Sequence, residues 1–170
     1  MNMNKALGLF LGIALLTACQ KSEVVSEFTG SQTTYALQAG SSYPISGMVI
    51  FKERKDGAVT VSVKLTGTSD GTTSPVHLHL GGVGTTQAAV AALLSPVTGK
   101  TGERETILRA LADESAVTYQ RLTQLDACVK VHLSDVGPER DIILAAGNVG
   151  TATTKSNPGG RLGIAVCKSN

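Results

Sequence analysis

The segment Val76-His77-Leu78-His79-Leu80 alternates apolar residues with histidines. In a β-strand, alternate side chains point to opposite faces, so the three apolar residues share one face and His77 and His79 share the other. One strand repeat separates the two imidazoles by roughly 7 Å. They are therefore close enough to contact one ligand or one metal ion.

The third and last histidine of the chain, His132, lies in a second segment of the same kind. Here the apolar residues of one face are Ala127, Val129, Val131 and Leu133, and His132 falls on the other face. Every histidine is thus predicted to lie on the less apolar face of a strand.

Alternation with a period of two recurs along the chain and predicts a mainly β fold. The clearest strand runs from Val59 to Leu65, after an Asp56-Gly57 pair that is typical of a hairpin turn. Further strands are predicted at Thr33–Gln38, Tyr43–Lys52, Ile142–Leu144 and Leu162–Val166. Seven or so short strands with glycine-rich connections indicate an antiparallel Greek-key β-sandwich or flattened barrel.

The middle of the chain, residues 85–124, is predicted to be a partly helical insert. Thr86–Ser95 is rich in alanine, and Gly102–Asp113 spaces its apolar residues as a helix does, so a short helix is expected in each. The alternative for Ala88–Leu94 is a strand followed by a long loop. Thr118–Asp126 is expected to form a turn into the strand that carries His132.

The N-terminus has the pattern of an export signal. A short n-region ending at Lys5 precedes an apolar stretch, Ala6–Leu16, that is too short to cross a bilayer. The following Leu16-Thr17-Ala18-Cys19 resembles the bacterial lipoprotein box. That resemblance implies removal of residues 1–18 and acylation of Cys19, for example with palmitate. The alternative is an ordinary secretory signal with a chance cysteine.

The same resemblance predicts a location in the bacterial cell envelope. Gln20 follows the cysteine, where aspartate would favour retention at the inner membrane, so the outer membrane is expected. Residues 19–33 are rich in Ser, Thr, Glu and Gly and are predicted to be a flexible tether, and residues 34–170 the β-domain.

The charge of the processed chain is nearly balanced. Without residues 1–18 it has 14 basic and 13 acidic side chains, because Lys5 is the only charged residue removed. A nucleic-acid partner is therefore not expected. The lipid is predicted to be the membrane attachment, and another envelope or extracellular protein is a candidate partner.

Two cysteines remain when Cys19 is assigned to the lipid, and an exported pair predicts a disulfide between Cys128 and Cys167. Closing a loop of this length would contribute about 4 kcal/mol in the chain-entropy model. The alternative is a metal site that uses both thiols together with His132.

The three histidines suggest a binding site for copper or zinc. Neutral imidazole is a good ligand for both ions, and three ligands leave a coordination position for water or another molecule. The alternative is that His77, His79 and His132 are structural or face solvent. Gly67-Thr68-Ser69-Asp70-Gly71 matches the letters Gly-x-Ser-x-Gly, but it lies in a predicted turn-rich loop that leads into the next strand and not on a strand-to-helix elbow. No phosphate-binding loop is present, so the sequence favours a binding module over an enzyme.

The order of a hairpin, a His-x-His strand, a long insert and a later Val-x-Val-His strand resembles the CHRD domain, first described in chordin and found in bacterial exported proteins. The matching residues are His77-Leu78-His79 and Lys130-Val131-His132, and the resemblance covers roughly residues 45–166. The family's Gly-Glu-Ile-Arg-Gly segment is replaced here by Glu139-Arg140-Asp141-Ile142. The resemblance implies a β-sandwich with a structural or binding role.

A more distant resemblance is to copper/zinc superoxide dismutase, a Greek-key barrel with a copper-binding His-x-His strand. It would place His77 and His79 on the copper ligands, and 157–162 with Cys167 on the glycine-rich turn and the disulfide cysteine of that enzyme. The dismutase uses more histidines and an aspartate for its second metal, and this chain offers only His132. A dismutase-like enzyme therefore ranks third, after a metal-binding module and a metal-free interaction domain.

Overall fold

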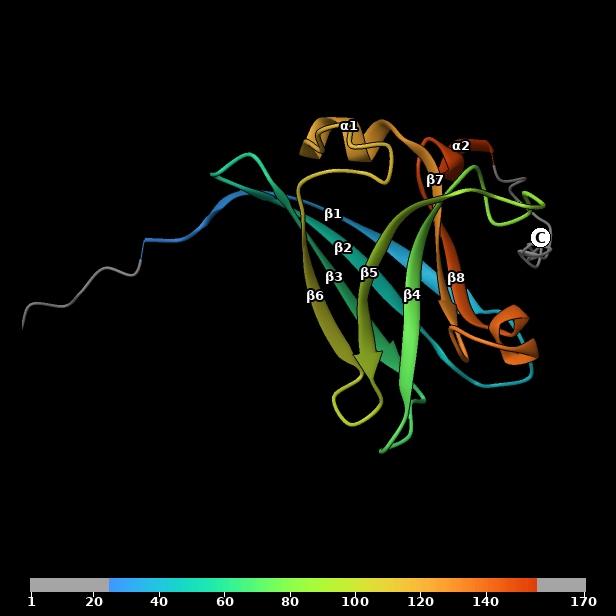
Figure 1. Cartoon of the computed structure of the whole chain (residues 1–170). Helices are drawn as coiled ribbons and strands as arrows, with labels where there is room; N and C mark the ends of the chain where they lie inside the picture. Colours follow the sequence, from blue (N-terminus) through green and yellow to red (C-terminus); the bar gives the residue numbers. More distant parts are fainter. Residues whose placement is uncertain (1–24, 156–170) are drawn as a thin grey trace, which may run out of the picture.

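The computed structural model describes residues 25–155, and it is mainly β. Eight antiparallel strands form one nearly closed, barrel-like sheet, in agreement with the predicted fold class (Figure 1). The elements in chain order are β1 (Phe28–Ala39), β2 (Ser46–Arg54), β3 (Val59–Thr66), β4 (Thr73–Leu80), β5 (Val90–Thr98), β6 (Glu103–Leu108), α1 (Tyr119–Gln124), β7 (Asp126–His132), a 3-10 helix η1 (Pro138–Asp141), β8 (Ile143–Gly150) and α2 (Ala152–Lys155).

The strand order in the sheet is β5-β4-β7-β8-β1-β2-β3-β6. β7 pairs with β4 although β5 and β6 lie between them in sequence, and β8 pairs with β1. Such non-sequential pairings are typical of Greek-key topology. β5 lies next to β6, where the Ser95 amide donates to Thr106 Oγ1 at 2.8 Å. This contact brings the two ends of the sheet together.

The interior of the barrel holds the apolar residues of the alternating pattern. Val76 and Leu78 of β4 are opposite Val131 and Val129 of β7, and all four are buried. α1 covers one end of the barrel and buries Leu122 there (Figure 1). The histidines of β4 and β7 consequently lie on the outer face of the barrel.

The hairpin and the Val59–Leu65 strand are confirmed, and Gly57 has the positive φ of 84° that the turn requires. The tether predicted over residues 19–33 is too long, because β1 already begins at Phe28. Its residue Phe28 pairs with Arg54, and Lys52 and Arg54 lie 5.7 and 5.8 Å from the phenyl ring. These contacts order the start of β1 ahead of the predicted domain boundary.

The helices predicted at Thr86–Ser95 and Gly102–Asp113 are wrong. The strand alternative for Ala88–Leu94 is correct in kind, since β5 begins at Val90. β6 replaces the second helix because it pairs along its whole length with β3, from Val59 opposite Leu108 to Lys64 opposite Glu103. Two exposed ion pairs, Glu103 with Lys64 at 3.1 Å and Glu105 with Lys52 of β2 at 2.8 Å, add to this pairing. The helical part of the insert is α1, in the segment predicted as a turn.

Thr118 explains why a helix forms there, since its side chain accepts from the Arg121 amide as an N-cap. No helix in the described part of the chain is both long enough and apolar enough to cross a membrane.

Candidate metal site

The barrel brings the three histidines together on the outer face of β4 and β7. In the pairing of these strands, His77 is opposite Lys130 and His79 is opposite Cys128. His132 follows at the end of β7, diagonal to His77. The ring centroids are 4.6 Å apart for His77 and His132, 5.7 Å for His77 and His79, and 5.9 Å for His79 and His132.

Two loops cover this part of the outer face. One connects β4 to β5 (81–89), and the other connects β7 to β8 and contains η1 (133–142). As a result, His79 is only 1% exposed and His132 only 2%, whereas His77 is partly exposed. The histidines were predicted to lie on the less apolar face of each strand, and the two loops make this face largely buried.

Each loop supplies a backbone carbonyl that holds one ring. His79 Nδ1 lies 3.0 Å from the Ala88 oxygen, and His132 Nδ1 lies 2.8 Å from the Arg140 oxygen. A carbonyl oxygen only accepts, so in both rings Nδ1 carries the hydrogen. In a neutral ring the lone pair is then on Nε2, which is the arrangement found in metal-binding histidines.

The possible ligand atoms of the three rings lie within 4.8 Å of one another. One ion bonded to three nitrogens at about 2.1 Å holds them roughly 3.3–4.2 Å apart, so small side-chain rotations would complete such a site. His132 Nε2 is buried and has no hydrogen-bond partner among residues 25–155. A buried acceptor without a partner costs free energy in the folded protein. A bound ion would give its lone pair a partner.

The environment keeps the imidazoles neutral. Burial lowers the pKa of His77 to about 4, with added repulsion from His132 and His79. Burial also lowers the pKa of His79 to about 4, against the opposing effect of its bond to Ala88, and it lowers the pKa of His132. The fully buried Lys130 adds positive charge near His79 and His132. All three lone pairs are therefore available for a metal at neutral pH.

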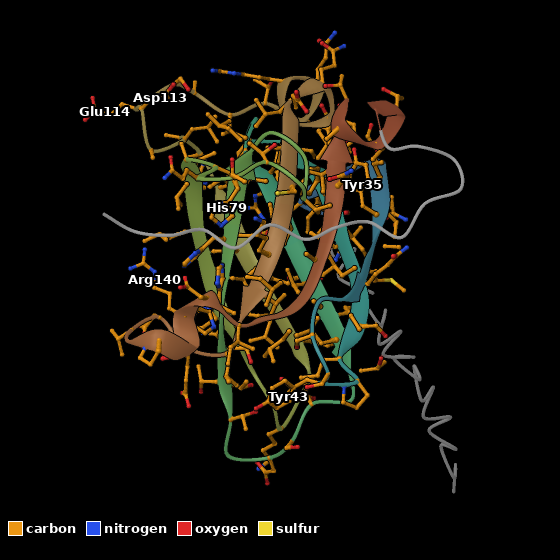
Figure 2. All side chains as sticks on the ribbon, turned by 90° about the vertical axis from the view of Figure 1, so that its right-hand side faces the viewer. Tyr35, Tyr43, His79, Asp113, Glu114 and Arg140 are labelled. Atoms are coloured by element: carbon orange, nitrogen blue, oxygen red, sulfur yellow. The ribbon has the colours of Figure 1, made fainter. Side chains whose placement is uncertain are left out.

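The cluster opens into a pocket of about 670 Å³. Besides the three histidines, its walls include apolar residues of β4 and β5 and two charged residues of the η1 loop; they are Pro75, Val90, Leu93, Leu94, Pro96, Asp135 and Arg140. Figure 2 shows Arg140 on the same side of the barrel as His79. No pattern in the sequence connects β5 or the η1 loop with the histidines, because only the strand pairing and the loop packing bring them together.

Of the three cysteines with a predicted role, Cys128 is within the residues that the structure describes. Cys128 is buried on the outer face of β7, in a small apolar cluster with Val83, Ile143 and Ala146. Cys19 and Cys167 lie outside the described residues, as do the 157–162 turn and the Leu162–Val166 strand. Acylation of Cys19 and the Cys128–Cys167 disulfide therefore remain predictions.

Comparisons with models of protein families, with curated proteins and with solved structures find no match to this chain. What the fold and the site define is thus a nearly closed antiparallel β-barrel with three clustered histidines on its outer face.

Proposed function

We propose that this protein is a metal-binding module of the bacterial cell envelope, attached to the outer membrane through a lipid on Cys19, and that His77, His79 and His132 bind one copper or zinc ion. The single observation that carries the proposal is the convergence of every histidine of the chain at one place, with ligand atoms within 4.8 Å.

The second observation in its favour is the support given to the rings. The carbonyl groups of Ala88 and Arg140 fix the orientation of His79 and His132 before any ion binds. Such outer partners set the ring tautomer and reduce the entropy lost on binding. If His132 had only a structural role, its buried Nε2 would be expected to have a hydrogen-bond partner. Within residues 25–155 it has none, which favours a binding role.

Three protein ligands leave a coordination position open, and all three histidines line the pocket. The ion would be able to hold a further ligand there. We propose binding rather than dismutation, because three histidines are too few for the two-metal site of the dismutases. A membership in the CHRD family, resting on the His77-Leu78-His79 and Lys130-Val131-His132 segments, forms part of the same proposal.

The test is a titration of the purified protein, without a His tag, with copper(II) and with zinc(II) in competition with a chromophoric chelator. One ion should bind per chain, and His77→Ala should weaken it by about tenfold or more. Thr73→Ala is the matched control, since Thr73 lines the same pocket on the same strand but cannot replace an imidazole. Binding that is absent, or equal in wild type and His77→Ala, would contradict the proposal and favour a metal-free interaction domain.

A further inference from the structure

The pocket beside the histidines has a polar part and an apolar wall. The polar part is formed by the histidine cluster, Arg140 and Asp135, and the wall is formed by Val90, Leu93 and Pro96 of β5. A volume of about 670 Å³ is within the range of pockets that bury one small organic molecule, roughly 300–1,000 Å³.

The apolar wall is adjacent to the metal ligands. Leu93 is directly opposite His77 in the pairing of β4 and β5, so the two side chains are neighbours on the outer face. Leu93 is nonetheless 70% exposed. Leu93 is a large apolar side chain that contacts water next to a polar cluster. A ligand that covers it would therefore bind more favourably, because apolar surface is removed from water.

The charge of Arg140 in the polar part of the pocket favours an anion. Within residues 25–155 the Arg140 guanidinium makes no ion pair or hydrogen bond, and its carbonyl holds His132. Asp135 also lines the pocket but is exposed, so water screens its charge. A divalent ion in place would add its charge to that of Arg140 and give the site a net positive charge.

We infer that the pocket binds an organic carboxylate with an apolar body, the carboxylate on the open position of the ion and beside Arg140, and the apolar body against Val90, Leu93 and Pro96. This inference rests on the proposed metal site and specifies its ligand. A carboxylate suits both partners, because it can bond an ion through oxygen and accept from a guanidinium. The apolar wall then selects acids with a hydrocarbon body over smaller anions.

The experiment is calorimetry on the purified protein, first titrated with copper(II) or zinc(II) and then, loaded with the ion that binds, with octanoate, acetate and 1-octanol. Octanoate should bind at least about tenfold more tightly than either of the others, because only octanoate has both the charge and the apolar chain. Arg140→Gln should weaken the binding of octanoate and of acetate alike, by about tenfold.

Leu93→Ser should weaken the binding of octanoate severalfold and leave the affinity for acetate unchanged. Two matched controls should bind octanoate as the wild type does: Leu80→Ser, which removes an exposed leucine outside the pocket, and Arg104→Gln, which removes an exposed arginine on β6.

Metal binding with equal affinity for octanoate and acetate, or equal effects of Leu93→Ser and Leu80→Ser, would overturn this inference and leave the metal site intact. No binding of copper(II) or zinc(II) in the first titration would instead overturn the metal site. Octanoate binding to the metal-free protein alone would overturn the claim that the carboxylate binds the ion.

Discussion

His132 donates its Nδ1 hydrogen to the carbonyl oxygen of Arg140 at 2.8 Å, and the side chain of the same arginine lines the pocket beside the ring. One residue of the η1 loop therefore orients a candidate metal ligand and supplies positive charge next to it. The position of this loop sets both the geometry and the electrostatics of the site.

The three histidines should differ in how much they contribute to folding. His77→Ala removes a partly exposed ring with no hydrogen bond within residues 25–155, so the free energy of unfolding of the metal-free protein should change by less than about 1 kcal/mol. His132→Ala removes a buried ring and leaves the Arg140 carbonyl without its donor, which should cost about 2–4 kcal/mol. Urea unfolding measures both, and equal losses would argue against the different burial of the two rings.

The metal-free protein should lose stability as the pH falls from about 6.5 to about 4. His77 and His79 have a pKa of about 4 in the folded protein against 6.5 for an ordinary histidine. Between these values the unfolded chain binds more protons than the folded protein, so the free energy of unfolding decreases with falling pH and the effect levels off below about 4. Their contribution is fully present above pH 6.5.

The check is urea unfolding at several pH values from 7.5 to about 4.5. The lowered pKa values of Glu53, Glu105 and Asp56 affect stability only near and below the lower end of this window, because their ordinary values are 4.5, 4.5 and 3.8. His77→Asn should flatten the curve. A wild-type curve already flat across the window would contradict the lowered histidine pKa values.

Gly147 of β8 should not tolerate a side chain. A Cβ atom there would lie 2.0 Å from the carbonyl oxygen of Ala36 in β1, at the place where β8 packs against β1. Gly147→Ala should therefore destabilise the protein by more than about 2 kcal/mol. Gly71→Ala is the control: it has the positive φ of 80° but no atom within 4 Å of an added Cβ, so it should cost only about 1 kcal/mol. Similar losses for the two variants would contradict this packing.

The predicted disulfide can be tested by counting thiols. Protein that is unfolded without reductant should have neither Cys128 nor Cys167 available for alkylation, whereas reduced protein should have both. Reduction should lower the free energy of unfolding by about 4 kcal/mol if the loop-closure model applies. Two reactive thiols before reduction would refute the pairing and favour the thiol metal site.

Much of the fold could be predicted from alternation, because a side-chain period of two does not depend on the partner strand. Val59–Leu65 and the two histidine segments were assigned in this way. The errors lie where local pattern and tertiary pairing disagree. Glu103 and Glu105 have helix-like neighbours in sequence, but in the sheet they are opposite Lys64 and Ser62 of β3.

The candidate site was predictable only in part, for a related reason. His77, His79 and His132 could be placed on common strand faces, and the pairing of β4 with β7 then brings them together. The carbonyl groups of Ala88 and Arg140 could not be predicted, since a backbone group has no sequence signature. Leu93 was also out of reach, because its position beside His77 depends on the register of β5.

The central claim is that three imidazoles hold one ion, and X-ray absorption spectroscopy of the metal-loaded protein tests it most directly. The account predicts three imidazole nitrogens at about 2.0–2.1 Å, decreasing to two in His77→Ala. A spectrum with one imidazole or none, or one that His77→Ala does not change, would contradict it.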